Sequence, residues 1–182
     1  MSDTAERLLQ QGLLARREHR LGDARRDLAE LVSLCRETGN SVELARGLTA
    51  LGQIERDLGQ GDAALRLYDE AVSLYRAAGD VLRLAHTIRH VGDIYRNQGH
   101  PKLAEPCYHE ALDLYRRDGR TLPLDLANAI RGLAILKFDG GEFEEARGLW
   151  QEAKDLYASL NVEAGVAESS RRLALLAARK GN

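Results

Sequence analysis

Three side chains that could hold a metal ion or transfer protons lie close together in the sequence. His86, His90 and Asp93 are separated by four and then three residues, so a helix would present them on one face. Arg89 would share that face and oppose a cation, and no fourth ligand is evident in this segment. We therefore expect the two histidines to make polar binding contacts, and we expect no metal site.

Other chemical motifs are not found. The sequence contains no P-loop, no GxGxxG and no nucleophile with a base at motif spacing, so we expect neither an enzyme nor a cofactor. Cys35 and Cys107 form no CxxC pair and lie in different segments, which favours two free thiols over a disulfide or a zinc site.

Arginine gives the second chemical signal, because it recurs at a nearly fixed spacing of about forty residues. The two series are Arg16, Arg56 and Arg96, and Arg89, Arg131 and Arg171. A guanidinium binds a carboxylate through parallel hydrogen bonds and stays charged at physiological pH. Ladders of this kind on an open surface would suit an acidic partner.

The spacing reflects a repeat in the whole chain. A segment ending in Leu-Cys-Arg, Leu-Tyr-Arg or Leu-Tyr-Ala precedes each of four pairs: Gly39-Asn40, Gly79-Asp80, Gly119-Arg120 and Leu160-Asn161. Self-similarity at this period predicts stacked helical units, each covering the apolar face of its neighbour.

Each repeat has the pattern of two amphipathic helices, with apolar residues every three or four positions, as in Leu44, Leu48 and Leu51. Between them, the glycines of residues 58–62 should end the first helix, and Asp62 should cap the second. Equivalent breaks are expected at 21–23, 99–101 and 139–141, and caps for the following units at Asn40, Asp80 and Asn161.

Alignment on these breaks produces columns of similar residues. The first helices share a small residue, at Gly12, Gly52, Gly92, Ala134 and Ala174. The second helices share an alanine, at Ala24, Ala64, Ala104 and Ala146, followed four residues later by a larger side chain, at Leu28, Tyr68, Tyr108 and Trp150. Small side chains let two helices cross closely, so we expect these columns to form the core.

With these columns the chain resembles the tetratricopeptide repeat family, whose motif is W-x2-L-G-x2-Y, then A-x3-F, then P. Leu48, Leu51, Gly52, Ala64 and Tyr68 match the motif in the second repeat, and the third and fourth repeats match it again. The repeats are about six residues longer than the standard thirty-four and are closed by glycine in place of proline. This form is similar to Leu-Gly-Asn-type adaptors, kinesin light chains and the sensor arrays of bacterial transcriptional regulators.

The resemblance implies an all-α fold, a right-handed superhelical solenoid of four antiparallel helix pairs and a C-terminal capping helix. We expect one domain over 1–182, with repeats at about 4–39, 41–79, 81–119 and 122–160, and the capping helix at about 162–180. Leu175 and Leu176 would have no following helix to cover them, which predicts a homodimer through this end.

The resemblance also places the first helices on a concave groove. The residues expected to line it for peptide binding are Arg16, Arg46, Arg56, Arg89, Arg96, Arg131 and Arg171, with Gln53, His86, His90 and Asn128. The full groove set holds ten arginines and five acids, about +5, against −2 for the whole chain. The alternative is that these arginines are solvated or paired with nearby acids such as Asp57 and Asp93. The family's carboxylate clamp is not reproduced, because Thr49, Ala50 and Gln53 occupy its columns.

These observations favour a protein-interaction scaffold or adaptor that binds an acidic or extended peptide segment. The alternative is a peptide- or partner-sensing module that acts with a separate transcriptional regulator. Nucleic acid is disfavoured, because the groove set has only Phe138 for base stacking and the net charge is −2. The sequence has no apolar run of roughly 18 residues, as a membrane span requires, and its N-terminus lacks signal-peptide features, so we expect a cytoplasmic protein without membrane partners.

Overall fold

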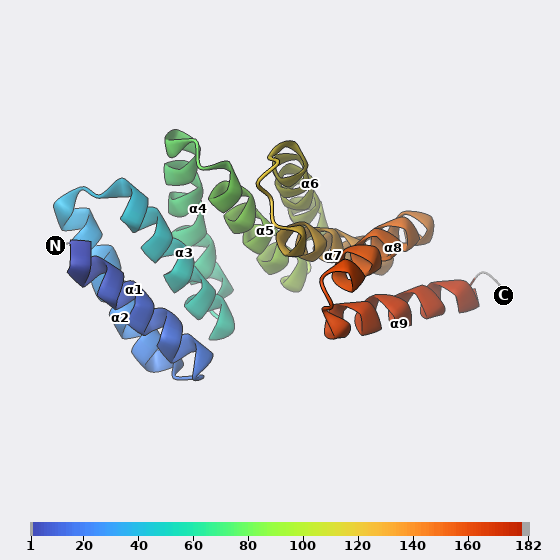
Figure 1. The fold of residues 1–182 in the computed structure, drawn as a ribbon, viewed down its shortest axis with the longest axis horizontal. Helices are drawn as coiled ribbons and strands as arrows, with labels where there is room; N and C mark the ends of the chain where they lie inside the picture. Colours follow the sequence, from blue (N-terminus) through green and yellow to red (C-terminus); the bar gives the residue numbers. More distant parts are fainter. Residues whose placement is uncertain (1, 180–182) are drawn as a thin grey trace. The chain divides into compact units, whose positions relative to one another are not determined.

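The computed structural model describes residues 2–179, and almost all of them are helical. Within this range nine α-helices are joined by short turns, and there is no strand (Figure 1). The helices are α1 (Ser2–Arg17), α2 (Leu21–Thr38), α3 (Ser41–Asp57), α4 (Gly61–Ala78), α5 (Val81–Asn97), α6 (Pro101–Arg117), α7 (Pro123–Asp139), α8 (Phe143–Ser159) and α9 (Glu163–Arg179). The all-α fold of four helix pairs and a last single helix is therefore confirmed. Residue 180, the end of the predicted capping helix, lies outside the described residues.

Contacts between Cα atoms divide the chain into two compact units, the first ending at Thr87 and the second beginning at Ile88, both within α5. In the first unit α1 packs on α2, α2 on α3, and α3 on α4, and Figure 1 shows consecutive helices running in opposite directions. In the second unit α6 packs on α7, α7 on α8, and α8 on α9. None of the helices described is both long enough and apolar enough to cross a bilayer.

The predicted columns meet where the two helices of a pair cross. A Cβ atom at Gly52 would lie 2.5 Å from Cε1 of Tyr68, and one at Gly12 would lie 2.6 Å from Cγ of Leu28. Both of these larger side chains are fully buried. The glycines are therefore needed for close approach, and in these two pairs a large side chain lies against bare backbone.

The last helix is better covered than we expected. Leu176 of α9 is 1% exposed and packs in a buried cluster with Ala134, Ala146 and Trp150. The prediction that Leu176 lacks a covering helix is wrong, because neighbouring helix positions point about 100° apart and Leu176 faces α7 and α8. Leu175 points away and is 52% exposed. The homodimer stays a prediction, and of the two leucines that suggested it, Leu175 is exposed and Leu176 is buried.

The breaks within the pairs are made by residues of left-handed conformation. Gly59, Gly99 and Gly141 have φ of 78°, 75° and 81°, as the glycine pattern predicts. In the first pair His19 takes this conformation, with φ of 59°, and α2 begins at Leu21. The first break therefore precedes the expected position at 21–23, and Gly22 lies inside a helix.

Two of the expected caps are confirmed. Oδ1 of Asn40 accepts the backbone N–H of Glu43 at 3.2 Å, and Oδ1 of Asp80 accepts that of Arg83 at 3.1 Å. Each side chain satisfies one of the backbone donors that are left unpaired at a helix start.

The other two caps are wrong. Asp62 lies inside the first turn of α4, where Gln60 is the N-cap residue and makes no side-chain cap. Asn161 has φ of 56° and closes α8, since its N–H donates to the carbonyl of Ala158 at 3.1 Å. Asparagine tolerates the left-handed conformation, so it does here what glycine does at the ends of α2 and α4.

The crossing predicts opposite effects for two glycine-to-alanine substitutions. Gly52→Ala should lower the free energy of unfolding by about 1–3 kcal/mol, because the new methyl group overlaps the buried Tyr68 ring. Gly148→Ala in α8 meets nothing within 4 Å and should raise it by about 0.5–1 kcal/mol through helix propensity. Urea unfolding followed by circular dichroism measures the free energy of unfolding of both variants. Equal changes in the two variants would contradict the proposed crossing.

Candidate functional site

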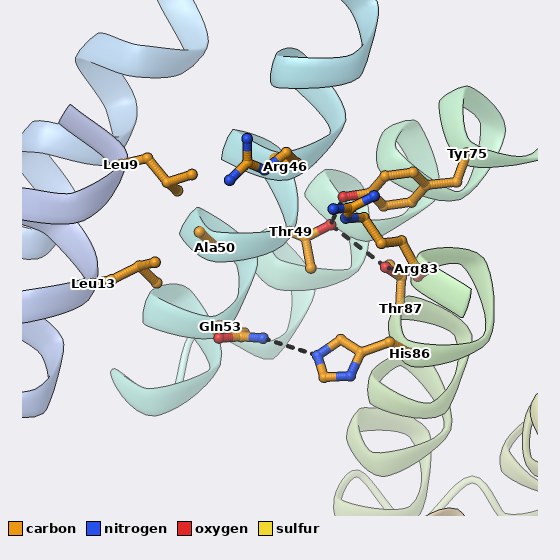
Figure 2. A pocket seen from close by; sticks show the side chains of 10 residues that line it. All are labelled: Leu9, Leu13, Arg46, Thr49, Ala50, Gln53, Tyr75, Arg83, His86 and Thr87. Carbon is orange, nitrogen blue, oxygen red and sulfur yellow. Dashed lines mark hydrogen bonds between the residues drawn. The ribbon is translucent and has the colours of Figure 1, made fainter. Parts of the chain in front are cut away.

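The first unit contains a hollow of about 210 Å³ (Figure 2). Most of the side chains that line it belong to α1, α3 and α5, each of which is the first helix of its pair. We call it the Arg46 hollow. It is lined by Leu9 and Leu13 of α1, Arg46, Thr49, Ala50 and Gln53 of α3, Tyr75 of α4, and Arg83, His86 and Thr87 of α5.

The hollow exists because a column of large side chains is interrupted at Thr49. Thr49 lies three residues before the small residue of its helix, where the next two repeats have Arg89 and Arg131. Its neighbour Ala50 is also small. Space that an arginine would fill therefore stays open between α1, α3 and α5, with Leu9 and Leu13 as an apolar wall (Figure 2).

Hydroxyl groups form one side of the Arg46 hollow. Oγ1 of Thr49 lies 3.4 Å from the hydroxyl oxygen of Tyr75 and 3.4 Å from Oγ1 of Thr87 (Figure 2). Each threonine also lies at hydrogen-bonding distance from a carbonyl one turn earlier, Thr49 from Ala45 at 2.9 Å and Thr87 from Arg83 at 2.8 Å. Thr49 donates its one hydroxyl hydrogen to the Ala45 carbonyl or to the hydroxyl oxygen of Tyr75, and the lone pairs of the threonine oxygens remain as acceptors. Burial raises the pKa of Tyr75, so its hydroxyl remains a donor.

Two arginines of the Arg46 hollow are anchored through one nitrogen each. Nη1 of Arg46 donates to both carboxylate oxygens of Glu43 at 2.9 Å and lies 3.5 Å from Oε2 of Glu6. Nη1 of Arg83 contacts the carboxylate of Asp80. In their ion pairs and side-chain hydrogen bonds with the described residues, both arginines use Nη1. Their Nε and Nη2 atoms therefore remain as donors. Among the described residues that line the hollow, none is acidic.

A polar chain leads out of the Arg46 hollow at its lower edge in Figure 2. Nε2 of Gln53 lies 3.3 Å from Nε2 of His86, and its Oε1 accepts Nη1 of Arg16 at 2.6 Å. Nε of Arg16 donates to Oδ2 of Asp57 at 2.8 Å. Burial opposes ionisation of Asp57, but Arg16 and Arg56 outweigh it and lower its pKa, so Asp57 is a carboxylate.

A second hollow of about 830 Å³ adjoins this chain of contacts, and we call it the Arg17 hollow. It is lined by Leu13, Arg16, Arg17, His19, Leu21 and Asp57. Leu13 lines both hollows, and Arg17 makes no ion pair or hydrogen bond with residues 2–179.

In the second unit the predicted groove residues gather around Asp93. Its carboxylate accepts Nη1 of Arg89 at 2.9 Å and the hydroxyl of Tyr108 at 2.8 Å, with Nη1 of Arg96 at 3.6 Å and Nδ1 of the buried His90 at 3.5 Å. Burial would raise the pKa of Asp93, but His90, Arg89 and Arg96 together hold it well below its ordinary value of 3.8. The carboxylate of Asp93 is thus shared among these neighbours, whereas Nε of Arg89 and Nη1 of Arg96 are buried and make no hydrogen bond with the described residues.

The remaining predicted residues of the second unit differ in their surroundings. Arg131 donates twice to Glu168, at 2.7 and 3.0 Å, and Asn128 accepts the hydroxyl of Tyr157 at 2.9 Å. Arg171 is exposed at the surface of α9 and makes no ion pair or hydrogen bond within the part of the chain that the structure describes. Most arginines of the two ladders are therefore paired with acids, which is the alternative that the sequence left open.

No three histidine, cysteine, aspartate or glutamate side chains are grouped as a metal ion would need within the described part of the chain. The structure instead gives each predicted histidine a polar neighbour, Gln53 for His86 and Arg89 for His90.

Four of the predicted groove residues line the two hollows: Arg46, Gln53 and His86 in one, and Arg16 in the other. Tyr75, Arg83 and Thr87 were missed, as were the leucines of α1. The signal that could have found them is the gap at Thr49 in the arginine column, beside the tyrosine of the Leu-Tyr-Arg segment.

Comparison with known proteins agrees with this architecture. Residues 43–117 match the sequence profile described as Tetratricopeptide repeat, so the predicted resemblance is confirmed. No curated protein matches the chain.

Solved structures share the fold at low sequence identity. BtubC (BKLC) from P. vanneervenii has a TM-score of 0.78 and 20% identity, over 86% of this chain and 64% of its own. The apo form of RapI has a TM-score of 0.84 and 12% identity, over 98% and 70%. A putative kinesin light chain from Podosopora anserina, with nearly identical TPR-like repeats, has a TM-score of 0.78 and 17% identity, over 100% and 89%. The chain thus spans less than two thirds of the length of BtubC.

The Asp93 cluster predicts a stability change with a defined pH dependence. Asp93→Asn should lower the free energy of unfolding at pH 7 by about 3 kcal/mol, because it leaves Arg89 and Arg96 without their carboxylate. Since the folded-state pKa of Asp93 is depressed, its contribution is full above about pH 5 and is lost progressively as the pH falls through and below its ordinary value of 3.8. The difference between the variant and the native chain should therefore narrow in acid.

Urea unfolding at several pH values between 7 and 2.5 measures this narrowing. Asp113→Asn serves as the control, because Asp113 is exposed and lies 3.7 Å from Arg117 only. A difference that stays constant with pH would show that the charge of Asp93 is not what stabilises the cluster.

Proposed function

We propose that this chain, which is built from tetratricopeptide repeats, is a protein-interaction scaffold that binds an extended segment of a partner protein in the Arg46 hollow. An acidic group of that segment would lie between Arg46 and Arg83, and a neighbouring aliphatic side chain would lie on Leu9 and Leu13. The role is one of binding, without catalysis.

The state of the two arginines carries the proposal. Each is held in place by a carboxylate through Nη1 and keeps Nε and Nη2 as donors. Anchored donors lose less conformational freedom when a ligand binds than mobile ones do. Because the lining contains two arginines and no acid, an anionic ligand group is favoured there.

The shape and polarity of the Arg46 hollow support an extended segment. Tyr75 presents a hydroxyl donor, the two threonines present acceptors, and Gln53 and His86 add an amide and an imidazole. A peptide backbone needs donors and acceptors in alternation, which this surface supplies beside an apolar wall. Stacked helical repeats commonly use an open inner surface of this kind for binding.

The proposal predicts that charge reversal at the two arginines removes partner binding. The double variant Arg46→Glu and Arg83→Glu should reduce capture of the native partner more than tenfold, because the ligand carboxylate would meet two acids. Capture from native extract followed by mass spectrometry identifies the partner, and titration with its purified form measures the affinity.

The matched control is the double variant Arg26→Glu and Arg66→Glu, which reverses the same charge at exposed positions on α2 and α4. It should bind the partner as the native chain does, and circular dichroism should show that both variants are folded. Equal capture by the two double variants would remove the Arg46 hollow as the binding site.

A further inference from the structure

We propose that the Arg46 hollow and the Arg17 hollow form one continuous track, and that the track selects an extended segment with two acidic side chains on one face, four residues apart. This rests on the proposed function and specifies which segment the scaffold takes.

The two hollows share one lining residue and are linked by one hydrogen bond. Leu13 lines both, and Arg16, which lines the Arg17 hollow, donates to Gln53 in the lining of the Arg46 hollow. Arg16 uses Nε and Nη1 for Asp57 and Gln53, so Nη2 is left as a donor.

The charge of the track favours an acidic ligand at both ends. The linings together hold Arg46 and Arg83 at one end, Arg16 and Arg17 at the other, and the single acid Asp57. Carboxylates outside the lining already pair with Arg46 and Arg83, so the track attracts an acidic ligand through the guanidinium donors that these pairs leave unused. Arg17 is exposed and pairs with no described residue, so it meets a ligand without first breaking a contact.

Two ion pairs fix the distance between the two ends. Arg46 contacts Glu6 at one level of the α1–α3 pair, and Asp57 contacts Arg16 at the other. Eleven residues of α3 separate Arg46 from Asp57, or about 16 Å, and ten residues of α1 separate Glu6 from Arg16, or about 15 Å, at 1.5 Å per helical residue.

The same distance corresponds to a short stretch of extended chain. An extended peptide rises about 3.3 Å per residue, and its side chains alternate between two faces, so two acids that face the track are separated by an even number of residues. Four residues span about 13 Å, the even separation nearest to 15–16 Å. Leu13 and Ala50 line the hollow beside the polar Gln53, and they suit an aliphatic residue between the two acids.

The test uses a series of fluorescent nine-residue peptides of serine and leucine with two aspartates. The aspartates are separated by two to seven positions at constant composition, and anisotropy measures binding. We expect the tightest binding at a separation of four, about tenfold tighter than a peptide with one aspartate, because both aspartates then face the track and each charge-assisted contact contributes at this order. Affinity that is the same at every separation would overturn the track.

Two variants assign the ends. Arg17→Glu changes an exposed side chain without a described partner and should leave the fold intact, while Thr49→Arg places in the Arg46 hollow the residue that stands at 89 and 131. Each should reduce the affinity for the peptide with aspartates four apart to that for the one-aspartate peptide. Arg66→Glu on α4 is the control and should bind as the native chain does. If Thr49→Arg does not fold, Arg83→Ala tests the same end.

The outcomes separate this inference from the proposed function. If Arg17→Glu keeps the preference for a four-residue spacing, the track is wrong, even where native partner capture still requires Arg46 and Arg83. If the partner is captured without Arg46 and Arg83, the proposed function itself is wrong.

Discussion

The contact on which the structure depends is the crossing of the two helices in each pair, where a small residue of the first helix faces a large side chain of the second. Gly12 against Leu28 and Gly52 against Tyr68 leave no room for even a methyl group. Because this contact sets the rotation of each helix about its axis, it decides which positions face the core and which face outward. Every other column of the repeat follows from that register.

The candidate site is a consequence of side-chain volume within this register. Thr49 stands in the column that holds Arg89 and Arg131 in the next two repeats, and the Arg46 hollow opens beside it. A repeat fold can therefore change its binding surface one position at a time without changing its backbone. Tyr75, near the end of α4, has two roles: its ring packs in the core, and its hydroxyl group lines the Arg46 hollow.

The arginines show why a count of charges overstates what a surface offers. Asp93 is shared by Arg89 and Arg96, and Glu168 takes both hydrogen bonds of Arg131. A half-buried guanidinium in these positions needs a carboxylate to offset its lost hydration, so most of the apparent surplus is used within the fold. The charges that remain for a partner are those with unused donors, such as Arg46 and Arg83, or those without partners among the described residues, such as Arg17.

The sequence alone determined the period, the helix pairs, the small-residue columns and the caps at Asn40 and Asp80, because these depend on residues close in the chain or on a pattern repeated several times. The tertiary structure decided the burial of Leu176, the role of Asn161 at a helix end, and which arginines are paired. It also decided where the hollows lie, since Leu9, Thr49, Tyr75 and Arg83 come from four different helices. Such contacts depend on how far one helix is displaced along its neighbour, a distance that periodicity does not encode.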